Sequence, residues 1–214
     1  MAATVGKSLH VRRLNWVQTT RDSVLGISFG LVVLMLAALI CFTRPFMDAM
    51  GLNPDITAFL WSGMSTDELR QMVFFVAPDV GMSFTPDEAD HLADVRSLLH
   101  STLLAAGALG VLLLAGSMLR PNWRRISTIA FGFLAALAAS GFTVWQLSGF
   151  KTVSHLFHNV FFSGGNWQFA SHQLMMKLYP PVVMQTGMTL CFIMALLVTG
   201  TFALVMATAK KKAR

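Results

Sequence analysis

Four long apolar runs, separated by polar or mixed connections, dominate the pattern of this chain. They cover residues 24–43, 98–118, 126–147 and 185–207. Each is close to or longer than the roughly 20 residues that cross a bilayer as a helix. We therefore expect an all-α membrane protein, a single integral membrane domain with four transmembrane helices.

A capped helix start leads directly into the second apolar run. Thr85 and Glu88 have the spacing of a capping box, and Pro86 stands at the first helical position, where its missing N–H costs nothing. No helix breaker separates Pro86 from the end of the run near Met118. The pattern predicts a helix longer than a bilayer is thick, whose polar first turns stand outside the membrane.

The two long connections, 44–97 and 148–184, are too apolar for solvated loops. In the first, Ser65 and Glu68 again have capping-box spacing, which predicts a short helix, and Pro78 to Gly81 has the composition of a turn. We expect both connections to form a cap, which packs on the helix bundle or lies at the lipid interface.

Composition and charge support a membrane protein and orient it. Only 12% of the residues are charged, against about 25% in soluble domains. Lys and Arg gather in three segments: residues 1–23, the connection between the second and third runs, and the C-terminal tail. Asp22 is the only acid in these three segments. By the positive-inside rule both termini are cytoplasmic and the cap faces outward. The net charge of +6 thus reflects topology and implies no nucleic-acid partner.

Five of the six histidines lie in or beside the two outward connections: His91, His100, His155, His158 and His172. Histidine is the side chain best suited to proton transfer near neutral pH. The sequence contains no nucleophile elbow, no Gly-rich phosphate loop and no cysteine–histidine metal pattern. We expect neither a metal nor a cofactor, and we expect Cys41 and Cys191 to be small apolar residues rather than a bridge.

Helical spacing separates these histidines into candidates. Asp94 lies three residues after His91 and could hold its imidazole. His100 is nine residues after His91, about half a turn away around the helix, so the two cannot face one site. His155 and His158 could share a face, although an amphipathic interfacial helix explains their spacing equally well.

Two motifs resemble those of the bacterial lipoprotein intramolecular transacylases, a family of four-helix membrane proteins. One is acid-x-x-His-x-x-Asp-Val-basic, present from Glu88 to Arg96. The other is Phe-His-x-x-Phe-Phe followed by an Asn-x-aromatic context, present from Phe157 to Phe162 and then from Asn166 to Phe169. A looser Leu-Tyr-Pro follows at 178–180, and the resemblance covers roughly residues 20–205.

The resemblance implies an enzyme of the bacterial inner membrane whose active site faces outward. It would move an acyl chain from the sn-2 oxygen of a diacylglyceryl lipoprotein to the α-amino group of its N-terminal cysteine. It implies catalysis by His91 and His158. We expect support from a group of nearby residues: Asp94, Arg96, His155, Asn159, Asn166 and Trp167. Diacylglyceryl lipoproteins and membrane lipids are the implied partners, and the oligomeric state is left open.

The chain departs from the family pattern at three places. Residues 170–173 lack the family's Asp, Pro181 stands where an acid is common, and Arg96 replaces a common Lys. Two other functions also fit the sequence. The outer histidines could ligate haem or a metal, or the cap could bind a partner in an accessory membrane protein.

Overall fold

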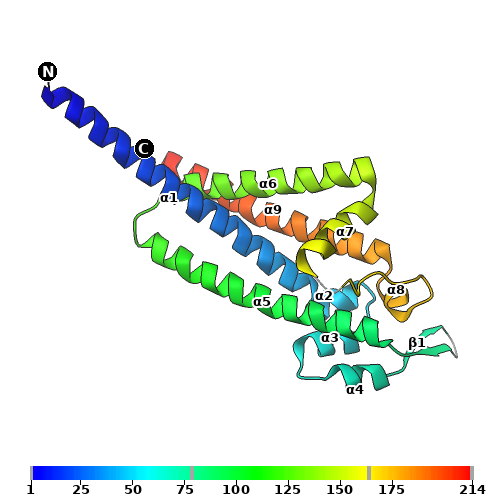
Figure 1. The fold of residues 1–214 in the computed structure, drawn as a ribbon. Helices are drawn as coiled ribbons and strands as arrows, with labels where there is room; N and C mark the ends of the chain where they lie inside the picture. Colours follow the sequence, from blue (N-terminus) through cyan, green and yellow to red (C-terminus); the bar gives the residue numbers. More distant parts are fainter. Residues whose placement is uncertain (1, 78–79, 163–164, 213–214) are drawn as a thin grey trace. The chain divides into compact units, whose positions relative to one another are not determined.

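The computed structural model describes residues 2–77, 80–162 and 165–212. Figure 1 traces long helices joined by short helices and one hairpin. In chain order the elements are α1 (Ala2–Cys41), α2 (Arg44–Ala49), α3 (Pro54–Trp61), α4 (Thr66–Gln71), β1 (Phe74–Ala77), β2 (Val80–Met82), α5 (Pro86–Ser117), α6 (Trp123–Ser148), α7 (Phe150–Phe161), α8 (Leu174–Leu178) and α9 (Pro181–Lys212).

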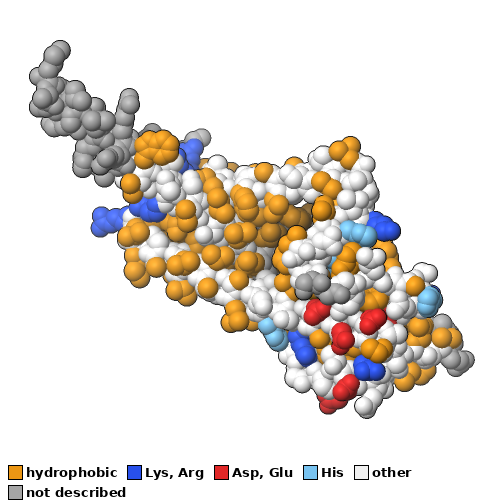
Figure 2. Space-filling view, in the orientation of Figure 1, with side chains coloured by type: hydrophobic (Ala, Val, Ile, Leu, Met, Phe, Trp, Pro, Cys, Tyr) orange, Lys and Arg blue, Asp and Glu red, His pale blue; other side chains and the backbone are white. Residues whose placement is uncertain are grey.

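The structure confirms the four predicted transmembrane helices. Four helical stretches are long and apolar enough to cross a membrane: Trp16–Cys41, Pro86–Ser117, Trp123–Ser148 and Pro181–Ala209. Apolar side chains cover much of their surface, whereas the acidic side chains gather elsewhere (Figure 2). Charged groups are costly in hydrocarbon, so this distribution suits helices that contact lipid.

A small antiparallel hairpin is the one departure from helices in the described chain. Phe74 pairs with Met82 and Phe75 with Gly81. The predicted turn at 78–81 is only partly tested, because residues 78–79 lie outside the described residues and Val80 and Gly81 belong to β2.

Two compact units share the long helices. One comprises Met1–Met35, Ala105–Ala138 and Phe192–Arg214, and the other comprises Leu36–Leu104 and Ala139–Cys191. In the first unit, glycines let α1 lie directly against α6. A Cβ atom at Gly26 would stand 2.8 Å from the Cβ of Ile129, so a larger residue there would force the helices apart.

The second unit has an apolar core that the short elements complete. Side chains from the end of α1 and from α3, α4, β1, α5 and α8 form one cluster, whose fully buried members are Ile56, Phe59, Leu69 and Ala89. The segment between α1 and α5 is therefore a packed structure. That it faces outward stays a prediction.

A buried carboxylate joins the start of α5 to α8. Glu88 has no exposed surface. Its Oε2 accepts hydrogen bonds from the backbone N–H of Thr85 at 2.8 Å and from the Thr85 hydroxyl at 2.9 Å. Its Oε1 accepts one from the backbone N–H of Met175 at 2.7 Å. The predicted capping box is thus present, and it also holds α8 in place.

We expect Glu88→Ala to destabilise the protein by about 2–4 kcal/mol, because it leaves the buried N–H of Met175 and two part-buried donors of Thr85 without their acceptor. Unfolding can be followed with a thiol-reactive dye, since Cys41 and Cys191 are both buried in the folded chain. Glu68→Ala is the matched control. Glu68 caps α4 through the same kind of box with Ser65, but at an exposed position. Equal losses in the two variants would show that the bond to Met175 adds nothing.

Candidate active site

Two histidines from distant parts of the sequence meet in the second unit. His91 lies in the second turn of α5 and His158 in the last turn of α7. Their ring centroids are 5.7 Å apart, and the ring planes differ by 26°. His91 is 6% exposed and His158 is 7% exposed. A pair of stacked imidazoles, nearly shielded from solvent, is an unusual arrangement that a hydrophobic core does not need.

The backbone of α7 decides which nitrogen of His158 is basic. The Nδ1 atom of His158 lies 2.7 Å from the carbonyl oxygen of Ser154, one turn earlier. A carbonyl oxygen only accepts hydrogen bonds, so Nδ1 must carry the hydrogen. In the neutral ring, Nε2 therefore holds the free lone pair and can accept a proton.

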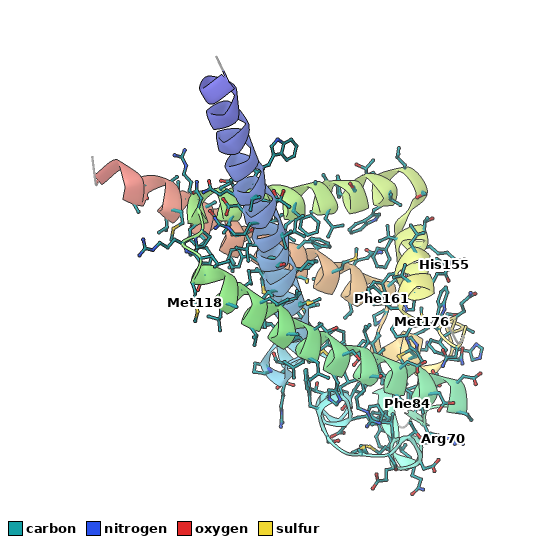
Figure 3. All side chains as sticks on the ribbon, turned by 60° about the vertical axis from the view of Figure 1, so that its left-hand side comes forward. Arg70, Phe84, Met118, His155, Phe161 and Met176 are labelled. Carbon is teal, nitrogen blue, oxygen red and sulfur yellow. The ribbon has the colours of Figure 1, made fainter. Side chains whose placement is uncertain are left out.

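Trp167 packs against two histidines at once. Its ring stacks on His158 with centroids 4.6 Å apart, and it meets His155 edge-on at 4.8 Å. Figure 3 shows the side chains of this region, with His155 on α7 and Met176 on α8. His91, His158, Trp167 and His155 thus form a continuous row of rings, which we call the ring row. Its members support one another in fixed orientations.

Aromatic side chains surround His91. Phe162 meets its ring edge-on at 4.9 Å, and Phe169 lies 5.6 Å away. The Nδ1 atom of His91 is buried and has no hydrogen-bond partner among the described residues. A buried polar atom without a partner is costly, so it needs an explanation, and a catalytic role is one.

Asp94 and Asn166 attach the connection between α7 and α8 to α5. The side-chain amide nitrogen of Asn166 donates to Oδ2 of Asp94 at 3.3 Å. The sequence suggested that Asp94 holds His91. In the described structure Asp94 accepts this hydrogen bond from Asn166, and its role toward His91 stays a prediction. Because Asn166 precedes Trp167, this bond helps to place the indole against His158.

Other predicted residues lie outside the ring row. Arg96 donates to the carbonyl oxygen of Met64 at 2.6 Å, and its guanidinium lies 4.5 Å from the centroid of the Phe59 ring. Arg96 therefore braces the segment between α3 and α4. Asn159 is exposed on α7. His100 is exposed as well, and it neighbours Trp61 with centroids 6.0 Å apart. His91 is buried in the ring row and His100 is exposed, so the prediction that the two do not face one site is confirmed.

Two parts of the site were missed in the sequence. The Ser154 carbonyl could have been found, since it precedes His158 by four residues and residues at that spacing are neighbours on a helix. Phe169 belongs to the second family motif, but its contact with His91 could not be predicted, because that contact depends on the path of an irregular connection.

The surroundings of His158 favour its neutral form. Burial lowers the pKa of His158 below its usual value, and the positive charge that His155 can carry lowers it too. The hydrogen bond to the Ser154 carbonyl acts in the opposite direction. At neutral pH His158 is therefore an uncharged base.

The histidines do not converge as metal ligands would. Both His155 and His158 pack against Trp167 rather than toward a shared point. Among the residues that the structure describes, no three His, Cys, Asp or Glu side chains are grouped so that they could hold a metal ion.

Comparison with known proteins points to one family. The model of the family described as lipoprotein intramolecular transacylase Lit matches residues 23–182. The fold is similar to that of the membrane integral lipoprotein intramolecular transacylase Lit from Bacillus cereus, with a TM-score of 0.65 at 12% identity over 94% of this chain and 99% of that one. A variant of the same protein with a histidine-to-alanine substitution aligns with a TM-score of 0.68 at 14% identity, over 96% and 99% of the two chains. No curated protein matches this chain.

We expect diethyl pyrocarbonate to modify exposed His100 and His172 at least about tenfold faster than buried His91 and His158, with peptide mass spectrometry as the readout. Asn166→Asp should speed the modification of His158, because it places a second carboxylate beside Asp94 and releases the connection that carries Trp167. Asn159→Asp, at an exposed position beside His158, is the control. Equal rates in both variants would contradict a positioning role for Asn166.

Proposed function

Because this chain belongs to the lipoprotein intramolecular transacylase family, we propose that it moves an acyl chain within diacylglyceryl lipoproteins. The acyl chain passes from the glyceryl sn-2 oxygen to the α-amino group of the N-terminal cysteine. The product is an N-acyl lyso-lipoprotein. The observation that carries this proposal is the buried, stacked pair of His91 and His158.

The reaction needs one net proton transfer, from the amine to the glyceryl oxygen, and two histidines are sufficient to assist it. The amine must lose a proton as it attacks the ester carbonyl, and the glyceryl oxygen must gain one as its bond to the acyl carbon breaks. In our proposal, Nε2 of His158 takes the amine proton, since Nδ1 is held by the Ser154 carbonyl. His158 then passes this proton to the departing glyceryl oxygen, which His91 holds by a hydrogen bond, so both histidines end in the protonation state in which they began.

No nucleophile from the protein is required, because the substrate supplies both the acyl donor and the acceptor. Holding the ester and the amine of one molecule side by side makes the attack intramolecular, which gives a large effective concentration. The amide hydrogens of Asn166 or Asn159 are candidates for stabilising the tetrahedral oxyanion.

Ser154 offers a competing mechanism through an acyl-enzyme. Its hydroxyl oxygen lies 3.4 Å from Nδ1 of His158. That nitrogen carries its hydrogen toward the Ser154 carbonyl, so it has no free lone pair with which to deprotonate the hydroxyl. The geometry therefore favours direct transfer.

The four apolar helices and the family make this a multi-pass membrane protein. We propose the bacterial inner membrane as its location, with the histidine pair facing outward. The support is the excess of Lys and Arg near residues 1–21, 120–125 and 210–214, which the positive-inside rule places in the cytoplasm. Diacylglyceryl lipoproteins in the outer leaflet could then reach the site along the membrane.

Replacing His158 or His91 by Ala should reduce N-acylation of a host lipoprotein by at least about 100-fold, because the first removes the base and the second removes the hydrogen bond to the departing oxygen. Mass spectrometry of lipoprotein N-termini distinguishes the lyso product from the diacylglyceryl form with a free amine. His100→Ala and Ser154→Ala should retain activity. Loss of activity in Ser154→Ala would support an acyl-enzyme, and full activity in His158→Ala would overturn the proposal.

The acid limb of the pH profile should report the protonation of His158. Activity is lost as the pH falls through the pKa of His158, which its surroundings lower. His155→Asn removes a charge that lowers this pKa, so the pKa of His158 rises and the acid limb moves to higher pH. Lys151→Gln, one turn from His155 and exposed, is the control. An acid limb that stays in place in His155→Asn would contradict His158 as the base.

A further inference from the structure

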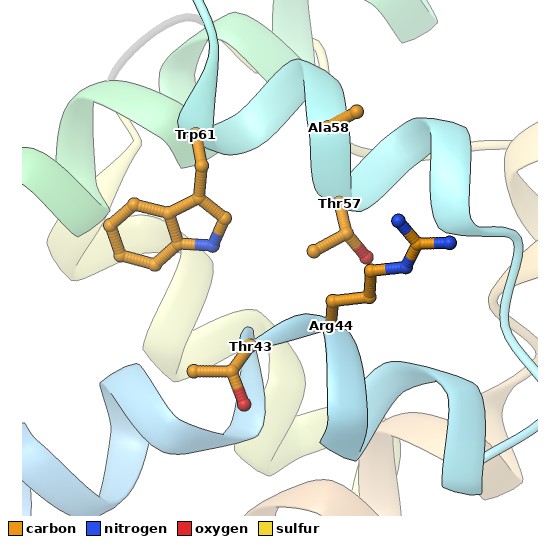
Figure 4. Close-up of a pocket in the computed structure, with 5 residues that line it drawn as sticks. All are labelled: Thr43, Arg44, Thr57, Ala58 and Trp61. Carbon is orange, nitrogen blue, oxygen red and sulfur yellow. The ribbon is translucent and has the colours of Figure 1, made fainter.

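A hollow with largely apolar walls and a few polar groups lies where α1 ends and α2 begins, apart from the ring row. It has a volume of about 450 Å³ and is lined by Thr43, Arg44, Thr57, Ala58 and Trp61 (Figure 4). These residues come from the α1–α2 junction and from α3. None of them belongs to the machinery proposed for acyl transfer.

The position of the hollow follows from the membrane helix beside it. The apolar stretch of α1 ends at Cys41, two residues before Thr43. The indole nitrogen of Trp61 donates to the carbonyl oxygen of Phe42 at 2.7 Å, which ties α3 to the end of α1. The hollow therefore lies at the depth where a bilayer has its headgroups, a depth at which Trp side chains are common.

The hollow combines groups that recognise a phosphate. Arg44 has a highly exposed side chain, and its Nε is 3.7 Å from Oδ2 of Asp48. Its two terminal nitrogens are the ones that guanidinium groups use to bind phosphate oxygens. In Figure 4 the hydroxyl of Thr57 lies on the side of that residue toward Arg44.

Thr57 gives the second, independent observation. The residue is only 4% exposed, and its hydroxyl oxygen is buried without a hydrogen-bond partner among the described residues. A residue that served only as an interfacial anchor would not need a buried hydroxyl without a hydrogen-bond partner. A phosphate oxygen placed against Arg44 would accept the Thr57 hydrogen and remove the cost of leaving it unpaired.

We propose that this hollow binds the phosphodiester of a membrane phospholipid. Arg44 and Thr57 hold the phosphate, and the indole of Trp61 lies beside the glycerol and upper acyl chains. The bound lipid is distinct from the substrate, because the diacylglyceryl group on a cysteine is joined through sulfur and carries no phosphate. Since the hollow joins the end of α1 to α2 and α3, an occupied site would brace the segment that packs on α5.

The test uses the full chain in maltoside detergent, titrated with dioleoyl phosphatidylglycerol and observed by native mass spectrometry. Arg44→Gln should weaken retention of one lipid by about tenfold, and Thr57→Val by about threefold, as expected for losing a charged and a neutral hydrogen bond. Arg70→Gln is the matched control. Arg70 is an exposed arginine in the same unit that pairs with Asp67 at 3.5 Å and does not line the hollow. Its loss should leave retention unchanged.

Three results would overturn the proposal. Equal effects of Arg44→Gln and Arg70→Gln on lipid retention would show that the lipid is held by general charge attraction. Equal retention of dioleoylglycerol, which lacks the phosphate, would show that acyl chains alone bind. Inorganic phosphate binding as tightly as the lipid would assign the site to a free anion.

Thr57→Val also serves as a folding control, because valine has nearly the same shape and removes an unpaired hydroxyl. Unchanged lipid binding in that variant would mean that Thr57 plays no part. Since the readout is lipid retention, failure here would leave the acyl-transfer proposal unaffected.

Discussion

The site depends on one buried carboxylate. Glu88 is fully enclosed, and it accepts three hydrogen bonds that join the first turn of α5 to the first turn of α8. His91 follows Glu88 by one helical turn, and Trp167 lies in the connection that leads into α8. By holding both elements, the carboxylate sets where the two halves of the ring row meet. A charge is enclosed at this position without a large cost because each oxygen has its donors.

Burial gives the histidine pair its chemical character. In a site with little water, two stacked imidazoles cannot both carry a charge without repelling each other strongly. His158 is therefore kept neutral, and the Ser154 carbonyl determines which of its nitrogens is basic. Such a base needs only to receive and pass on a proton. This is sufficient for a reaction in which the substrate brings its own nucleophile.

The departures from the family pattern have structural explanations. Where the family tends to have an Asp, the side chain of Gln173 accepts a hydrogen bond from the backbone N–H of Ala170 and closes the turn before α8. Pro181 begins α9, a position where proline is favoured. Arg96 places its guanidinium over the ring of Phe59, a contact that suits a flat cation better than an ammonium group. None of the three lies in the ring row.

The sequence alone determined the long helices and one half of the chemistry. Apolar run lengths predicted the four helices, the Thr85–Glu88 spacing predicted where α5 starts, and helical periodicity separated His91 from His100. These signals are local, so the chain shows them without a fold. Motif resemblance, rather than spacing, paired His91 with His158. Only the tertiary structure brought these rings together, gave the hydrogen bond of Asp94 to Asn166, and placed Phe169 against His91. Such contacts join residues far apart in the chain through irregular connections, whose paths are set by packing and by buried hydrogen bonds such as those of Glu88.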